Sequence, residues 1–171
     1  MSKILNKYSV KFTALLSAVM LISLSVLYSC SANIFSVEDD VSMGKELNQQ
    51  IKDESKQFPV LKGHQDVKDY VSGLGKYVLE NSSAIKYKNV FPYQFEIIED
   101  DSTVNAFCIS GGYIYVYTGL IKFLDNEAAL TGVIGHEIAH AEKRHMTQRL
   151  TSYYGVSVVL GLVLGNNPNQ L

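Results

Sequence analysis

The sequence predicts an α+β fold in which N-terminal helices lead into a small, mostly antiparallel sheet that packs on a long buried helix. Three observations support this fold class. Apolar residues recur at helical spacing between residues 36 and 81, and β-rich runs follow between residues 93 and 118. Helical spacing then returns from Asn126 to about Tyr153 without an intervening proline. Residues 36–171 are therefore expected to form one domain.

The N-terminus has the pattern of a targeting segment. Lys3, Lys7 and Lys11 precede an uncharged apolar run from Phe12 to Ser29, which is typical of a secretory signal peptide. We therefore expect residues 1–29 to be a signal peptide rather than part of the fold.

The residues after this run predict how the protein is attached to a membrane. Leu27–Ser31 resembles a bacterial lipobox, in which Cys30 becomes the lipid-modified first residue and residues 30–35 form a tether. An uncleaved membrane helix is the alternative, because a run of 18 apolar residues is just long enough to span a bilayer. Either arrangement delivers the domain across a membrane and keeps it attached.

Two helices are expected before the sheet. The first begins at Ser36, a hydroxyl N-cap followed by acidic residues, and Gly44 inside it indicates that another segment packs closely there. The second extends from Gln65 to about Asn81. Their apolar positions at helical spacing are Val41, Met43, Leu47 and Ile51 in the first helix, and Val67, Tyr70, Val71, Leu74, Tyr77 and Val78 in the second.

Three strands are expected next. Residues 93–99 alternate in polarity, and residues 104–109 and 112–118 flank Ser110-Gly111-Gly112, a suitable hairpin connection. In the last strand one face carries three tyrosines, which we expect to be packed or half-exposed rather than catalytic. These are Tyr113, Tyr115 and Tyr117.

Charge and cysteine content limit the possible functions. The formal net charge of −2 shows no excess of basic residues of the kind that nucleic-acid-binding domains carry, so nucleic acid is not an expected partner. If Cys30 carries lipid, Cys108 has no partner for a disulfide within the chain. Cys108 is then equally expected to be a small core residue or a reactive thiol. Residues 155–165 are apolar but too short to span a bilayer, which predicts a core helix or an apolar surface awaiting a partner.

The sequence His136-Glu137-Ile138-Ala139-His140 has the form H-E-x-x-H. On a helix the two histidines are one turn apart and about 40° apart around the axis, so both imidazoles can reach one cation. Glu137 borders the same face without having to bind the metal. Zinc lowers the pKa of a bound water toward about 7, and a neighbouring carboxylate can take its proton. The motif therefore predicts a zinc site with Glu137 as general base.

The helix around the motif is expected to be buried on two sides. Asp125 or Asn126 offers an N-cap, and Glu127 places negative charge in the first turn. One stripe contains Leu130, Ile134, Ile138, Ala141 and His145, and the other contains Ala129, Val133, His136 and His140.

The histidines of this helix have alternative interpretations. His136 and His140 could be hydrogen-bonded residues of a packed helix, but burying two imidazoles with a carboxylate is costly unless something coordinates them. On a continuous helix His145 lies about 180° from His136. We therefore expect His145 to point away from the metal, hydrogen-bonded in the core or behind a metal ligand.

Several stretches together resemble the M48 family of zinc metallopeptidases, in particular its bacterial periplasmic members of the Oma1 and BepA type, which are often lipoproteins. The resemblance covers most of the chain after the signal segment. The matching stretches, in order, are residues 36–44, Val104-Asn105-Ala106-Phe107, residues 111–121, Asn126-Glu127-Ala128-Ala129-Leu130, the H-E-x-x-H motif and Arg144-His145.

The resemblance implies a zincin-like α+β fold with one zinc ion per chain, held by His136 and His140, and with Glu137 as the base. It also implies a membrane-tethered metalloendopeptidase that degrades unfolded or misfolded envelope proteins. The expected place is the periplasmic side of the cell envelope, with a lipid anchor in the outer membrane. An exposed strand edge beside the metal helix can hold an extended peptide by main-chain hydrogen bonds. The residues expected to bind substrate are Asn105, Gly111, Gly112 and Tyr113.

Two features depart from the family's pattern. Cys108-Ile109-Ser110 stands where relatives tend to have alanine, an apolar residue and proline. In the family the third zinc ligand is a glutamate on a later helix, and this sequence ends at Leu171 before any such segment. We therefore expect a metallopeptidase domain that is incomplete at its C-terminus. The alternative function is a non-catalytic, peptide-binding lipoprotein that has lost the third ligand.

Overall fold

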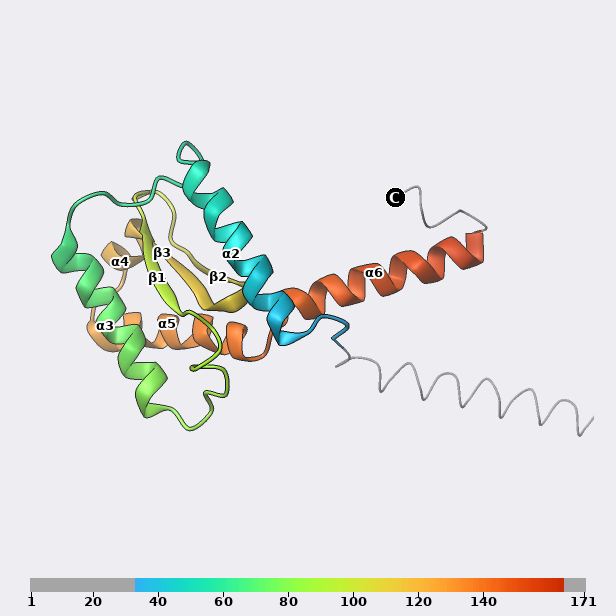
Figure 1. The fold of residues 1–171 in the computed structure, drawn as a ribbon. Coiled ribbons are helices and arrows are strands. Elements are labelled where there is room, and N and C mark those ends of the chain that lie inside the picture. The colour runs from blue at the N-terminus through green and yellow to red at the C-terminus, as the bar shows by residue number, and fades with distance from the viewer. Residues whose placement is uncertain (1–32, 165–171) are drawn as a thin grey trace, which may run out of the picture.

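The computed structural model describes residues 33–164 and has an α+β architecture (Figure 1). The predicted signal segment and Cys30 lie outside the described residues. Two helices come first, the strands follow, and three helices end the described chain. The elements are α2 (Val37–Asp53), α3 (Gln65–Asn81), β1 (Gln94–Ile98), β2 (Ala106–Ile109), the short 3-10 helix η2 (Ser110–Gly112), β3 (Tyr113–Tyr117), α4 (Thr118–Phe123), α5 (Glu127–Glu142) and α6 (His145–Leu164).

The sheet has three strands in the order β1-β3-β2, so β3 is its centre. β2 and β3 form the predicted antiparallel hairpin, joined by η2. β1, however, runs parallel to β3, with Gln94 opposite Tyr113. The expectation of a mostly antiparallel sheet is therefore wrong. After β1, residues 99–105 lead to β2 at the opposite edge of the sheet, and β3 then lies between β1 and β2. The sheet is mixed.

Helices cover both faces of the sheet. On one face, Ile114 and Val116 of β3 belong to a buried cluster with residues of α3 and α5. On the other face, Tyr113 and Tyr115 pack in a second cluster with Ile51 of α2. The predicted alternation along β3 is confirmed, and the molecule has three layers: α2, the sheet, and the pair α3 and α5 (Figure 1).

α2 begins where the sequence predicts and packs closely on the hairpin connection. The hydroxyl of Ser36 accepts a hydrogen bond from the Asp39 amide, and the Asp39 carboxylate accepts one from the Ser36 amide. This reciprocal capping satisfies two free amides at the helix start. A Cβ atom on Gly44 would lie 2.0 Å from the carbonyl oxygen of Ser110. The close contact that the glycine indicates is confirmed.

α5, which carries the H-E-x-x-H motif, is buried along one stripe only. Asn126 is its N-cap and accepts a hydrogen bond from the Ala129 amide at 2.9 Å. In the second predicted stripe His136 is exposed and the remaining members are half-buried, so burial on two sides is wrong. The buried residues of the first stripe are Leu130, Ile134, Ile138 and Ala141.

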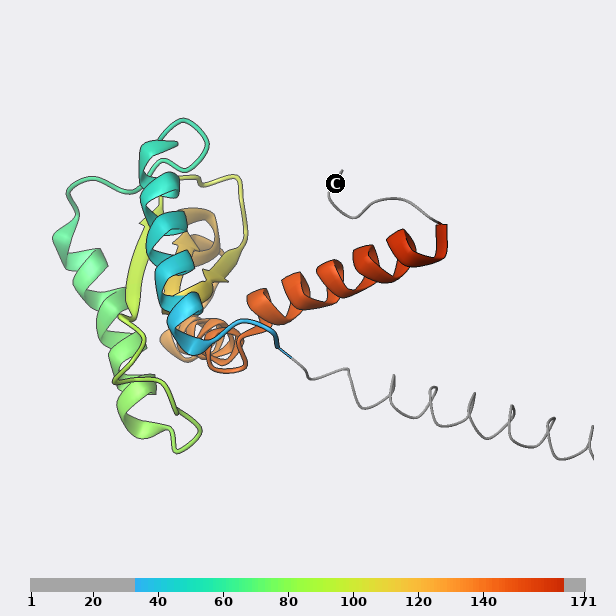
Figure 2. The same ribbon diagram turned by 45° about the vertical axis from the view of Figure 1, so that its right-hand side comes forward.

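The predicted continuous helix to about Tyr153 is interrupted. α5 ends at Glu142, Arg144 adopts a left-handed backbone conformation with φ 56°, and α6 begins at His145. α6 then runs away from the three layers, as Figures 1 and 2 show from two directions. Within residues 33–164, no helix has the length and apolar character needed to cross a membrane.

Candidate metal centre

His136 and His140 lie on successive turns of α5 with their rings edge to face. Their Nε2 atoms are 3.0 Å apart, and the ring centroids are separated by 4.7 Å. Two zinc–nitrogen bonds of tetrahedral geometry place their nitrogens roughly 3.3 Å apart. Since His136 is exposed and His140 half-buried, an ion from solvent can reach both. The structure therefore brings the two predicted ligands together at a spacing that suits one metal ion.

Glu137 lies on the inner side of α5. The residue is only 9% exposed, although its neighbour His136 is exposed. Burial, and then the charge of the Glu137 carboxylate, raise the pKa of the Cys108 thiol on β2. The Glu137 carboxylate is thus close enough to β2 for its charge to act on this thiol.

His145 is not where a continuous helix would place it. Because the helix breaks at Lys143 and Arg144, the ring of His145 turns back toward α5. Its Nδ1 atom lies 2.8 Å from Nδ1 of His140. The expectation that His145 points away from the pair is wrong, whereas the structure shows the other expected feature, a hydrogen bond to the ring of a predicted metal ligand. Desolvation, followed by the charges of His140, Lys143 and Arg149, lowers the pKa of His145.

A buried carboxylate, Asp40 of α2, holds this turn of the chain. Asp40 is 1% exposed and accepts hydrogen bonds from Ser110 Oγ at 3.2 Å and Thr147 Oγ1 at 2.9 Å. The Nε–H of Arg144 donates to the same carboxylate and forms an ion pair with it. One side chain of α2 thereby joins η2, the α5–α6 break and the first turns of α6.

Sequence reasoning missed Asp40 because an acid in the first turn of a helix is usually a solvated partner of the helix dipole. A signal was nevertheless present. Asp40, Gly44, Leu47 and Ile51 are spaced 4, 3 and 4 residues apart, which puts the acid in line with the inward stripe of α2. In the structure Asp40, Gly44 and Ile51 are the buried residues of that helix.

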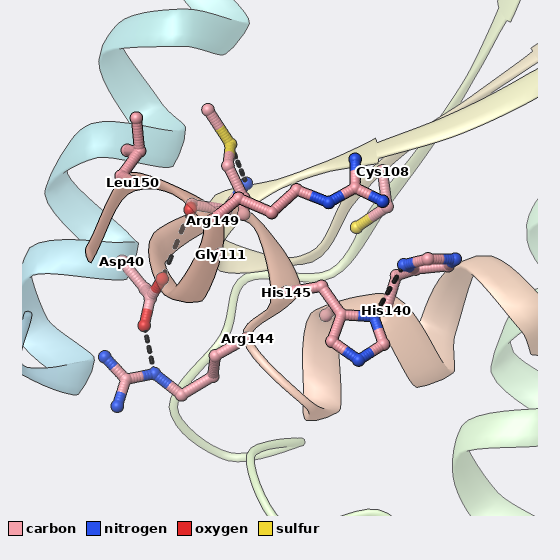
Figure 3. Close-up of a pocket in the computed structure, with 11 residues that line it drawn as sticks. Asp40, Cys108, Gly111, His140, Arg144, His145, Arg149 and Leu150 are labelled. Atoms are coloured by element: carbon pink, nitrogen blue, oxygen red, sulfur yellow. Dashed lines mark hydrogen bonds and ion pairs between the residues drawn. The ribbon is translucent and has the colours of Figure 1, made fainter. Parts of the chain in front are cut away.

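A cavity of about 230 Å³ lies between this ion pair and the histidines (Figure 3). Asp40 and Arg144 line one end of it, and His140, His145 and Cys108 line the other. Two of the dashed lines in Figure 3 run from Asp40 to Arg144 and from His145 to His140. The cavity therefore opens directly beside His140.

The remaining predicted site residues are placed around the hairpin. Asn105 is exposed just before β2, whereas Gly111, Gly112 and Tyr113 are buried. A Cβ atom on Gly112 would meet the ring of Tyr93 at 2.7 Å, and Gly111 packs on α2. These placements explain the two glycines by close packing, and a role in substrate binding stays a prediction for all four residues.

The histidine pair fits zinc in donor type and in spacing. A catalytic zinc ion usually has three protein ligands and a water molecule. Among residues 33–164, no group of three His, Cys, Asp or Glu side chains is arranged to hold a metal ion. The described part of the chain thus supplies two candidate imidazole ligands and one nearby carboxylate, Glu137.

These features belong to a known class of peptidase. Residues 66–168 match the model of peptidase family M48, which is more than half of the chain, and the protein belongs to that family. The match begins in α3 and includes the whole sheet, α5 with its H-E-x-x-H motif and α6.

Among curated proteins the chain is similar to proteases of bacteria and mitochondria. It is 30% identical over 101 residues to the beta-barrel assembly-enhancing protease of Yersinia pestis, covering 56% of this chain and 20% of that protein. The protein of the same name in Escherichia coli K12 is 31% identical over 81 residues, covering 47% and 16%. The mitochondrial metalloendopeptidase OMA1 of Arabidopsis thaliana is 40% identical over 55 residues, covering 32% and 11%. The chain thus spans about a fifth or less of the length of these relatives.

Proposed function

We propose that the protein is a zinc-dependent metalloendopeptidase that is tethered to a membrane and hydrolyses peptide bonds in envelope proteins. The observation that carries this proposal is the convergence of the His136 and His140 Nε2 atoms at 3.0 Å, beside the largely buried carboxylate of Glu137. Membership of peptidase family M48 and relatives named as metalloendopeptidases support it.

Each residue of the motif has a distinct role in this proposal. His136 and His140 would hold the zinc ion with the Nε2 lone pairs of neutral imidazoles. When bound, zinc lowers the pKa of a coordinated water molecule. Glu137 accepts the proton of the attacking water and returns it to the leaving amine.

The substrate is proposed to be an extended, unfolded segment of polypeptide. β2 is an edge strand of the three-stranded sheet and lies against α5, so a peptide pairing with this edge runs beside the histidines. Relatives named for their role in beta-barrel assembly support a place in envelope protein quality control. The signal-like segment and Cys30 support a lipid-anchored protein on the periplasmic side of the outer membrane.

A pair of matched substitutions in α5 tests the catalytic assignment. Glu137→Gln is expected to lower proteolysis of an unfolded protein substrate by at least about 100-fold, because general base catalysis contributes that much or more, while bound zinc stays unchanged. Glu127→Gln is the control, since Glu127 is exposed at the start of the same helix. Cleavage is followed by gel and zinc by atomic absorption. Full activity of Glu137→Gln would falsify its role as base.

The alternative is a peptide-binding lipoprotein without catalysis, which is favoured by the finding of only two arranged ligands among residues 33–164. Zinc content of the purified protein separates the two. Stoichiometric zinc that is lost in His140→Ala supports the peptidase, because one imidazole alone binds zinc weakly. No zinc uptake at micromolar concentration supports the alternative.

A further inference from the structure

We propose that the buried ion pair of Asp40 and Arg144 is a positioning device for the metal centre, acting through His145 on His140. This inference deepens the proposed function and rests on it for the identity of the metal. In this proposal Asp40 and Arg144 are positioning residues rather than metal ligands or catalytic residues. Their role is to fix the orientation of one ligand.

Arg144 lies at the break between α5 and α6 and is held there by several contacts. The guanidinium of Arg144 is held at both ends: Nε donates to Asp40, and Nη2 donates to the carbonyl oxygens of Phe35 and Ser36, both at 2.6 Å. A left-handed backbone is unfavourable for a residue with a side chain and persists when its surroundings hold it. The ion pair stabilises Arg144 in this conformation and so ends α5.

The second step is the consequence of the break for His145. In an unbroken helix His145 and His140 would be five residues apart, about 140° around the axis, and could not face one another. After the break their rings are 4.7 Å apart between centroids, and the two Nδ1 atoms are 2.8 Å apart. The ion pair therefore brings His145 into contact with the predicted metal ligand.

The third step is the effect on His140 itself. Its two ring nitrogens face different partners, with Nε2 toward His136 and Nδ1 toward His145. A histidine that binds metal through Nε2 carries its proton on Nδ1 and needs an acceptor there. The lone pair of His145 Nδ1 supplies that acceptor, provided that His145 keeps its own proton on Nε2. The contact fixes both the ring orientation and the tautomer of His140.

The test compares three variants of the full chain by zinc affinity, measured by competition with a chromophoric chelator. Asp40→Asn breaks the ion pair while keeping the size of the side chain, and His145→Ala removes the contact while leaving the ion pair intact. Each is expected to weaken zinc binding about 10- to 100-fold, the usual effect of losing a partner of a metal ligand. Asp101→Asn is the matched control, because it breaks an exposed ion pair with Lys122, and its affinity should equal that of the unmodified protein.

A double variant separates positioning from a general loss of stability. If Asp40 acts through His145, then Asp40→Asn adds less than about two-fold to the effect of His145→Ala, since the two changes break one chain of contacts. Fully additive losses overturn the inference. Thermal unfolding of each variant confirms that the measurements are made on folded protein.

A second readout needs no metal and keeps this inference distinct from the proposed function. The ¹⁵N chemical shifts of the imidazoles in the metal-free protein report the tautomers of His140 and His145. They should change in Asp40→Asn and stay unchanged in Asp101→Asn. If the unmodified protein binds no zinc, the proposed function fails, and the shifts still decide the positioning role. If Asp40→Asn leaves both the shifts and the zinc affinity unchanged, the positioning role is overturned while the peptidase proposal stands.

Discussion

At the residue scale, burial lowers the reactivity of the Cys108 thiol beside the candidate metal centre. Its side chain lies on β2, packs against the cluster shared with α3 and α5, and lines the cavity beside His140. Burial first, and the Glu137 carboxylate second, raise the pKa of its thiol. Because the thiolate is the nucleophilic form, a raised pKa makes the thiol inert at neutral pH.

The raised pKa of Cys108 predicts slow alkylation of its thiol in the folded protein. In the folded protein at pH 7.5, iodoacetamide should modify Cys108 at least about tenfold more slowly than in the urea-unfolded chain, whose thiol pKa is about 8.5. The measurement is mass spectrometry of the peptide that contains Cys108, which separates it from Cys30. Equal rates in the folded and unfolded chains would contradict the burial of this thiol.

The same shift predicts how stability changes with pH. A folded-state pKa that is raised above the unfolded value contributes stability that is complete below about pH 8.5 and decreases as the pH rises above it. Above about pH 8.5 the free energy of unfolding should therefore decrease less with pH in Cys108→Ala than in the unmodified protein. The sequence left open whether Cys108 is a core residue or a reactive one, because the choice depends on contacts across the sheet that no local pattern contains.

At the scale of elements, the close contact of α2 with η2 depends on Gly44. Alanine at this position places its methyl group 2.0 Å from the Ser110 carbonyl oxygen, a backbone atom that cannot move without shifting the hairpin connection. Gly44→Ala is therefore expected to lower the free energy of unfolding by about 1–3 kcal/mol or more, despite the better helix propensity of alanine.

Gly73→Ala in α3 is the matched control for this prediction. Nothing lies within 4 Å of the Cβ that it would carry, so only the gain in helix propensity remains. We expect Gly73→Ala to raise the free energy of unfolding by about 0.5–1 kcal/mol. Urea unfolding followed by circular dichroism measures both. A destabilisation by Gly73→Ala as large as that by Gly44→Ala would show that the packing argument fails.

The elements also show what the sequence can and cannot predict. Ser36 with Asp39, and Asn126, mark helix starts through local hydrogen bonds, and both starts were predicted to within a residue. The break at Arg144 was not predicted, because neither glycine nor proline stands there. Its cause is Asp40, 104 residues earlier in the chain. A local sequence pattern can predict a helix end that local residues determine, but not one that depends on a contact with a residue far away in the chain.

On the scale of the whole molecule, β3 separates the two buried clusters and contributes to both. Ile114 is fully buried in the cluster with α3 and α5, at the centre of the sheet. Ile114→Ala should lower the free energy of unfolding by about 2–5 kcal/mol, the loss expected for a large core side chain that leaves a cavity. Ile34→Ala, at a position that is 69% exposed, should change it by less than about 0.5 kcal/mol. Similar losses in both variants would contradict the central place of β3.

The overall arrangement could be predicted only in part. Helical and β-type spacing gave the fold class, and the alternation along β3 gave its two packed faces. The parallel pairing of β1 with β3 could not be read from local sequence, because strand order is decided by which strands meet across the sheet. The meeting of His136 and His140 was predictable from helix geometry alone, whereas the place of His145 depends on the tertiary contact with Asp40.

The direction of α6 has a mechanical consequence. The helix starts with the residue that touches His140, and its 20 residues extend about 30 Å from there. Because His145 is the first residue of α6, a change in the direction of α6 at Arg144 would also change the position of the His145 imidazole beside His140.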